Sequence, residues 1–283
     1  MTFVTNGGTL VESQVIEKSG DKAEKPADPT RLGHVFQGWY LDGKPFDFNT
    51  KITKSLTITA EWKNVGPLRD DHIAYIHGYG DGRVGPNNDI TRAEAAQIFF
   101  NLLTDEAHAK YDTTANSFTD VSSDAWYNEA VSTLANMGVI VGIGDNKFAP
   151  TSKMSRAEFA TVCVRLYNLS SNNGTKFTDV DENAWYAKYV AAAAENGWVT
   201  GYGDGRFGPT DNITRAQVVS LLNRVLCRQP KNEKSFAGLE YNNWTDNQDT
   251  NAWYYLDLIE AGTGHNCVYD GTNHETWTSL LGK

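Results

Sequence analysis

The stretch GYGDGRFGPTDNITRAQ, residues 201–217, occurs in three versions in this chain of 283 residues. The other two are GYGDGRVGPNNDITRAE at residues 78–94 and GIGDNKFAPTSKMSRAE at residues 142–158. Each version joins a glycine-containing turn to a Thr or Ser that is followed at once by Arg. Self-similarity at a nearly regular spacing is the sequence signature of a repeat architecture. The repeat therefore decides the fold of most of the chain.

A front half precedes this stretch in only two of the three repeats, as FTDVSSDAWY at 118–127 and FTDVDENAWY at 177–186. The first repeat lacks one, but a spare copy, WTDNQDTNAWYYLDLIEAG, begins at Trp244. We therefore expect a C-terminal helical segment, 244–283, to complete the first repeat and close a ring of three units. The predicted repeat boundaries are about 67–116, 117–175 and 176–230, within a domain that spans 67–283.

The residues after each Arg follow the i, i+3, i+4, i+7, i+8 spacing of an amphipathic helix. Three equivalent helices with inward apolar stripes favour a mainly α, pseudo-threefold bundle, in which Cys163 is a core residue. The stripes are Ala95, Ile98, Phe99, Leu102 and Leu103; Phe159, Val162, Cys163, Leu166 and Tyr167; and Val218, Leu221, Leu222, Val225 and Leu226.

The start of each of these helices fits a capping box. In this motif a Thr or Ser hydroxyl accepts a hydrogen bond from the N3 amide, and the N3 Glu or Gln reaches back to the N-cap amide. These residues therefore need no role beyond starting a helix. The pairs are Thr91 with Glu94, Ser155 with Glu158, and Thr214 with Gln217.

The arginine at the first helical position is not explained by capping, since a cation there opposes the helix dipole. Two interpretations stay open for Arg92, Arg156 and Arg215. In one, each spans to a loop of its own repeat, with Asp81, Asp145 and Asp204 as candidate partners. In the other, a helix N-terminus and a guanidinium fork together form an anion pocket.

Residues 1–63 read as a small β-rich domain. SLTITAEW, residues 55–62, alternates with Leu56, Ile58, Ala60 and Trp62 on one face. HVFQGWY and KPFDF are two further predicted strands around the turn LDGK, and residues 10–18 are a candidate for another.

The composition limits the partners of the chain. Its 25 Lys and Arg against 35 Asp and Glu give a formal net charge of −10, which argues against a nucleic-acid binder. No apolar run reaches about 18 residues, so no membrane insertion is predicted. The N-terminus lacks the basic segment and apolar core of a signal sequence. Either the protein stays inside the cell, or this is a piece of a larger exported protein.

Residue types that commonly bind metals or catalyse reactions are scattered. Cys163, Cys227 and Cys267 form no CxxC pair, and the six histidines form no HExxH and no close sequence cluster with cysteine. DVDENAW lacks the Gly and Glu of a calcium loop, and no GxSxG or P-loop is present. The sequence therefore predicts no metal site, no cofactor and no enzymatic activity.

Three of the eight tryptophans, Trp126, Trp185 and Trp253, each precede a Tyr at the start of a predicted helix. Their default interpretation is local core. The alternative is an edge shared with a groove, where an indole ring can stack on a sugar.

Together, FTDV, the following WY, and GYGDGRFGPTDNITRAQ resemble the S-layer homology (SLH) module. The resemblance implies a three-pronged helical domain of three repeats that binds a secondary cell-wall polysaccharide non-covalently and tethers surface proteins to Gram-positive cell walls. In many members the polymer carries pyruvate ketals, whose carboxylate suits Arg92, Arg156 and Arg215. Asp81, Asp204, Trp126, Trp185 and Trp253 are further candidate ligand-binding residues.

The segment GHVFQGWYLDGKPFDFNTKITKSLTITAEW, residues 33–62, resembles the β-grasp-like repeat of Listeria–Bacteroides-type surface proteins. The two resemblances imply the wall-anchoring end of a larger extracellular protein. Two alternatives stay open: an adhesin or interaction module that works through the β domain, and a fragment of a cell-wall glycan hydrolase. The absence of an identifiable pair of catalytic carboxylates counts against the hydrolase.

Overall fold

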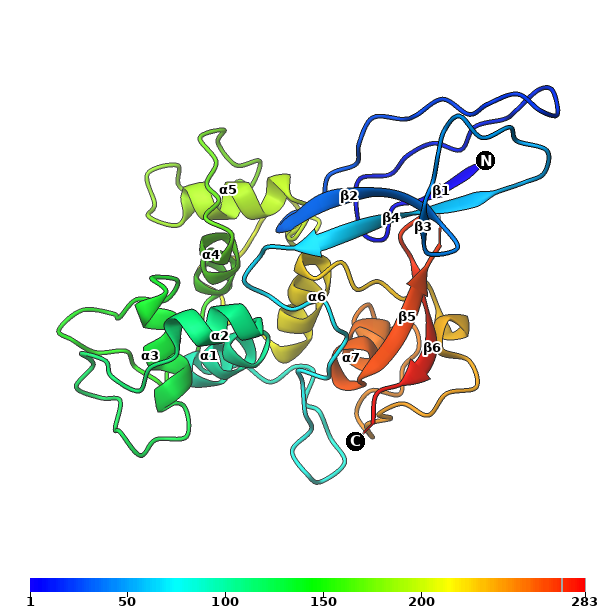
Figure 1. Cartoon of the computed structure of the whole chain (residues 1–283). Coiled ribbons are helices and arrows are strands. Elements are labelled where there is room, and N and C mark those ends of the chain that lie inside the picture. Colours follow the sequence, from blue (N-terminus) through cyan, green and yellow to red (C-terminus); the bar gives the residue numbers. More distant parts are fainter. Residues whose placement is uncertain (271, 283) are drawn as a thin grey trace.

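The computed structural model describes residues 1–270 and 272–282, which form a small sheet and a mainly helical region (Figure 1). The fold class is therefore α+β, as the sequence predicts. The strands are β1 (Thr2–Val4), β2 (His34–Leu41), β3 (Lys44–Pro45), β4 (Thr57–Asn64), β5 (His265–Tyr269) and β6 (Glu275–Leu280). The helices are α1 (Arg92–Asn101), α2 (Asp105–Tyr111), α3 (Asn128–Asn136), α4 (Arg156–Leu166), α5 (Ala187–Glu195), α6 (Arg215–Val225), the 3-10 helix η1 (Glu233–Phe236) and α7 (Tyr255–Gly262).

The N-terminal sheet has the strand order β1-β4-β2-β3, with β1 parallel to β4 and the other neighbours antiparallel. The predicted alternation in β4 is confirmed at its centre, where Ile58 and Ala60 are fully buried. They pack with Phe3 and Trp39 in the core of this small domain. A register shift next to Gly38, which has a positive φ of 137°, bends β2 over that core.

The prediction of a strand at residues 10–18 is wrong, since this segment contains no strand. Leu10 and Val15 are exposed, and Val11 is partly buried against the core of the small domain. The chain is held instead by single contacts, such as the hydrogen bond from the amide of Gln14 to the carbonyl of Met1. The sheet gains its fourth strand from the very N-terminus, β1.

The helical region is built from three helix pairs: α3 packs against α1, α5 against α4, and α7 against α6. The predicted apolar stripes of α1, α4 and α6 are confirmed, because they lie in one continuous core. Cys163 is fully buried within that core, as expected. All three predicted capping boxes are present, with Thr91, Ser155 and Thr214 as N-caps.

Each repeat is hydrogen-bonded to the next through the first turn of its capped helix. The amide of Arg92 donates to the carbonyl of Ser152, that of Arg156 to Asp211, and that of Arg215 to Asn88. These bonds run from the first repeat to the second, from the second to the third, and from the third back to the first.

The C-terminal segment reaches the turn of the first repeat. The carboxylate of Asp246 accepts hydrogen bonds from the amides of Val84 and Gly85, at 2.9 and 2.8 Å. Within the second repeat, Asp120 binds the amides of Phe148 and Ala149 in the same way.

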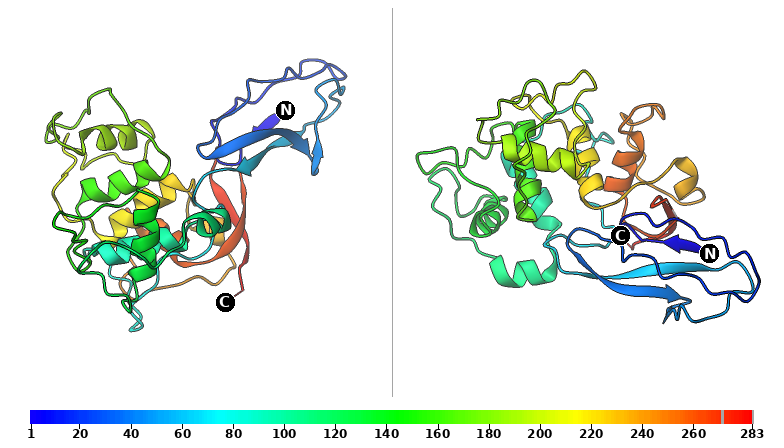
Figure 2. Two further views of the ribbon diagram at one scale, coloured as in Figure 1. Left: turned by 60° about the vertical axis from the view of Figure 1, so that its left-hand side comes forward. Right: turned by 90° about the horizontal axis from the view of Figure 1, so that it is seen from above.

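The expectation that residues 244–283 are helical is wrong for most of that segment. An α-helix covers only Tyr255–Gly262, and β5 and β6 then form an antiparallel hairpin. Alternation explains the difference, since Glu275 and Trp277 of β6 are buried while Thr276 and Thr278, which follow them in turn, are exposed. The views in Figure 2 place this hairpin between the helices and the N-terminal sheet. None of the helices in the described ranges is long and apolar enough to cross a membrane.

Candidate functional site

The three motif arginines are buried, and each links its own repeat to a neighbouring one by a hydrogen bond. Their side chains lie at the first position of α1, α4 and α6, and the residues are 7%, 9% and 7% exposed. In each, Nε donates a 2.8 Å hydrogen bond to a carbonyl of a neighbouring repeat. Arg92 binds Phe148, Arg156 binds Phe207, and Arg215 binds Val84.

The interpretation that each arginine spans to a loop carbonyl or carboxylate of its own repeat is therefore wrong about the repeat, since the carbonyl that Nε binds belongs to a neighbouring one. Asp81 and Asp204 instead lie at the exposed tips of their turns, where each pairs with the arginine two residues later. The side-chain hydrogen bond from Arg83 lowers the pKa of Asp81, and that from Arg206 lowers the pKa of Asp204. These two acids thus stabilise their own turns and do not contact the motif arginines.

Around Arg92, the guanidinium is fully engaged by protein groups. Nη1 donates to Oε1 of Glu158 at 2.7 Å and Nη2 to the carbonyl of Val141 at 2.8 Å, in addition to the Nε bond. Burial lowers the pKa of this guanidinium, and Glu158 offsets part of that effect. A groove of about 330 Å³ passes here, lined also by Arg165 and Trp185. In this groove the charge of Arg92 is already paired with the carboxylate of Glu158.

Around Arg156, the guanidinium is largely free. Only Nε has a hydrogen-bond partner among the described residues, while the group lies over the rings of Tyr202 and Phe207, 4.6 and 4.9 Å from their centres. Gln217 holds the position in α6 that Glu158 holds in α4, and no carboxylate among the described residues forms a direct ion pair with Arg156. Burial lowers the pKa of Arg156, and the charges of Asp211 and Asp179 offset part of that effect.

Arg156 lines a groove of about 510 Å³. Its described lining contains a second cation, Arg224, and no Asp or Glu. Trp198, Tyr202 and Trp253 supply aromatic surface beside the two cations. Two guanidinium groups next to aromatic rings form a site suited to an anionic sugar.

Arg215 has fewer hydrogen-bond partners than Arg92 and more than Arg156. Nη2 donates to the carbonyl of His77 at 2.6 Å, and the guanidinium lies 5.0 Å from the ring centre of Tyr79. Among the described residues, Nη1 has no hydrogen-bond partner. The three arginines share one scaffold role but differ in how much of the fork remains available.

The local-core interpretation of the three tryptophans is wrong. Trp126, Trp185 and Trp253 are 63%, 56% and 62% exposed, and each ring stands edge-on to the Tyr that follows it. Trp185 lines the groove of Arg92, and Trp253 lines the groove of Arg156. The structure therefore pairs two of the predicted arginines with two of the predicted tryptophans.

One group of chemically active residues lies apart from these grooves and was missed by the sequence reasoning. His72, His265, Cys267 and Glu275 come together in the structure. The only local signal is the alternation of His265 and Cys267 along β5. His72 is remote in sequence, so no spacing rule brings it to them.

Known protein families match both the helical region and the N-terminal sheet. The S-layer homology domain family matches residues 74–96, 117–160 and 176–219, and the Listeria–Bacteroides repeat domain family matches residues 1–61. The chain carries three S-layer homology segments behind a Listeria–Bacteroides repeat. The first matched segment is the shortest, which agrees with the missing front half of the first repeat.

Several curated relatives are similar over the helical region. A cellulosome-anchoring protein of Acetivibrio thermocellus is 32% identical over 217 residues, covering 75% of this chain and 47% of the relative. A surface-layer 125 kDa protein of Lysinibacillus sphaericus is 31% identical, over 53% of this chain and 13% of the relative. An amylopullulanase of Thermoanaerobacterium thermosulfurigenes is 30% identical, over 56% and 8%. The chain thus spans half or less of the length of these relatives.

Proposed function

We propose that this chain anchors a larger protein to a bacterial cell wall by binding an anionic secondary wall polysaccharide non-covalently. The names of the relatives support an anchoring role at the cell surface, since they include a cellulosome-anchoring protein and a surface-layer protein. The observation that carries the proposal is the groove of Arg156, with two arginines, aromatic walls and no acidic lining residue. We propose this groove as the principal binding site.

The proposed ligand group is a carboxylate carried on a sugar, such as a pyruvate ketal. A planar guanidinium offers two parallel donors to a carboxylate, and both terminal nitrogens of Arg156 are available. The exposed ring of Trp253 supplies a face for a neighbouring sugar. The groove of Arg92 is a weaker site, because Glu158 competes for the same fork.

For the domains, we propose a β-grasp-like unit at 1–63 and a pseudo-threefold unit from 67 onward. The bonds from Asp246 to Val84 and Gly85 support the assignment of the C-terminal segment to the first repeat. We propose no reaction for the chain. The relatives that are enzymes match it over a small share of their length, and the Arg156 groove has no carboxylate.

Cosedimentation with purified cell walls tests this proposal, with walls compared before and after chemical removal of the secondary polymer. We expect binding to native walls and its loss from stripped walls. Equal binding to both would refute the proposed ligand. Turnover of the purified polymer by the chain alone would favour the hydrolase instead.

A further inference from the structure

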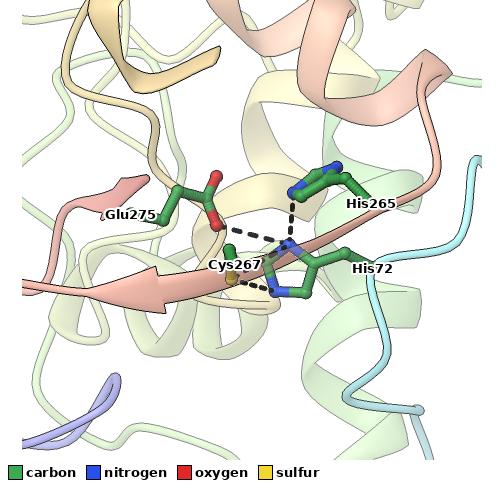
Figure 3. A group of neighbouring side chains, drawn as sticks. All are labelled: His72, His265, Cys267 and Glu275. Atoms are coloured by element: carbon green, nitrogen blue, oxygen red, sulfur yellow. Dashed lines mark hydrogen bonds and ion pairs between the residues drawn. The ribbon is translucent and has the colours of Figure 1, made fainter. Parts of the chain in front are cut away.

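A compact group of metal-binding residue types lies where the C-terminal hairpin meets the start of the helical region (Figure 3). His265 and Cys267 lie on β5, Glu275 begins β6, and His72 precedes the turn of the first repeat. One potential ligand atom from each lies within 4.8 Å of all the others. Both histidines and Glu275 are buried.

The spacing of these atoms suits a single ion. Nδ1 of His72 lies 2.9 Å from Nε2 of His265, 3.3 Å from Oε2 of Glu275 and 3.9 Å from Sγ of Cys267. Neighbouring ligands around a tetrahedral zinc, with bonds of about 2.0–2.3 Å, lie roughly 3.3–3.8 Å apart. Small side-chain adjustments therefore bring all four atoms to bonding distance of one centre.

The buried carboxylate of Glu275 is the feature that indicates a bound cation. The residue is 1% exposed, and neither carboxylate oxygen has a hydrogen-bond partner among the described residues. A buried carboxylate without a partner is strongly unfavourable. The single N–H that His72 can present at Nδ1 faces three acceptors, since Glu260 lies 3.1 Å away beside His265 and Glu275.

Outer hydrogen bonds orient both imidazole rings for metal binding. Nδ1 of His265 lies 2.8 Å from the carbonyl of Thr263, so this nitrogen carries the proton and Nε2 presents its lone pair to the cluster. Nε2 of His72 lies 3.3 Å from the hydroxyl of Tyr269, which leaves Nδ1 to face inward. Such second partners are typical of metal-ligating histidines.

We propose that His72, His265, Cys267 and Glu275 bind a structural Zn²⁺ ion. Two imidazoles and a thiolate favour zinc over Ca²⁺ or Mg²⁺, which prefer oxygen ligands. The thiolate and the Glu275 carboxylate are the two anionic ligands of this set, and the buried carboxylate of Glu260 adds negative charge beside both imidazoles. Four protein ligands in a buried position leave no open place for a substrate, so the ion acts on structure.

The ion would fasten the hairpin to the rest of the molecule. His72 belongs to the start of the helical region, while the other three ligands belong to β5 and β6. The same hairpin holds the N-terminal sheet, because Asn273 binds the hydroxyl of Thr5 at 2.9 Å and the carbonyl of Gly8 at 2.6 Å. Zinc would thus stabilise the contact between the β domain and the anchoring domain.

The competing account is a metal-free cluster that shares protons. Burial beside Glu260 raises the pKa of the Glu275 carboxyl, so without a cation this group is held protonated. The two accounts differ in an observable way, since only a metal site requires the Cys267 thiolate.

The test uses the whole chain after removal of metals with a chelator. Zn²⁺ is titrated back and the melting temperature is followed, and Co²⁺ is added in parallel as a spectroscopic probe. We expect uptake of one Zn²⁺ per chain, a higher melting temperature with Zn²⁺, and a thiolate-to-cobalt charge-transfer band.

Cys267→Ser and Glu275→Gln should each weaken Zn²⁺ binding by more than about 100-fold, since changes to outer partners alone weaken it about 10–100-fold. Cys227→Ser is the matched control, because this thiol lies outside the four ligands. It should keep both the band and the affinity. Zinc uptake without a thiolate band, or a melting temperature unaffected by Zn²⁺ in the native chain, would overturn the proposal. The native cobalt spectrum decides the matter even if a variant fails to fold.

Discussion

Nη1 of Arg92 donates a 2.7 Å hydrogen bond to Oε1 of Glu158, forming an ion pair across the boundary of the first two repeats. The corresponding position beside Arg156 holds Gln217. Arg92 is thus paired with a carboxylate and also binds the carbonyl of Val141, whereas neither terminal nitrogen of Arg156 has a hydrogen-bond partner among the described residues. Both arginines link neighbouring repeats, but only Arg156 keeps terminal nitrogens that can bind a ligand.

Glu158→Gln should turn the first groove into a binding site. The single amide oxygen can keep the capping bond from the amide of Ser155, as Gln217 does for Thr214, and an N–H₂ group then replaces the oxygen that accepts from Arg92. Removing the carboxylate frees a charge-assisted donor, which is worth about 1.5–3 kcal/mol to a bound anion. Calorimetry with the purified wall polymer should show tighter or additional binding. Unchanged binding would mean that this groove is not used.

Gln217→Glu should have the opposite effect in the second groove. A carboxylate placed beside Arg156 would compete with the ligand, and we expect polymer binding to weaken by about 1.5–3 kcal/mol. Gln97→Glu is a matched control, since it adds the same charge on α1 at a residue that lines neither groove. A similar loss in both variants would point to net charge and away from the groove.

Asp246→Asn tests whether the C-terminal segment completes the first repeat. The amide would direct an N–H₂ group at one of the two backbone amides of Val84 and Gly85. We expect a loss of about 1–3 kcal/mol in the free energy of unfolding, measured with urea. Asp120→Asn should cost a similar amount. Asp249→Asn should cost less, because its one amide oxygen can still accept the single bond from the amide of Asn251.

Thr214→Ala should lower the free energy of unfolding by about 1 kcal/mol, because the N-cap hydroxyl accepts from the amide of Gln217. The hydroxyl does not line the Arg156 groove. Polymer affinity of the folded protein should therefore stay unchanged, which separates the cap from the arginine beside it. A loss of affinity without a loss of stability would assign the threonine to the site.

Local features of the fold were predictable from the sequence because they rest on neighbouring residues. The capping boxes need only residues three apart, as with Thr91 and Glu94, and the apolar stripes need only helical spacing. The alternation of β4 was equally readable. The hairpin β5–β6 was missed because the repeat pattern of residues 244–262 suggested that the helix continued.

The sequence indicated which residues belong to the candidate site, but it did not indicate which groups they contact. Arg156 stood out because capping does not explain an arginine at the start of a helix. Its partner, the carbonyl of Phe207, belongs to another repeat, and nothing local indicates that pairing. The exposure of Trp253 likewise depends on how repeats pack. His72 and His265 meet only through the fold, so no sequence signal places His72 in their cluster.

The most direct test compares Arg156→Ala with Arg92→Ala in wall cosedimentation, with thermal unfolding measured on the same samples. Arg92→Ala removes three hydrogen bonds and Arg156→Ala removes one, so Arg92→Ala should lose the more stability. The account predicts that Arg156→Ala weakens wall binding by about 1.5–3 kcal/mol, with partial recovery in Arg156→Lys, while Arg92→Ala binds nearly as well as the native chain. Native-like binding by Arg156→Ala, or equal losses in both variants, would contradict it and leave the arginines as struts alone.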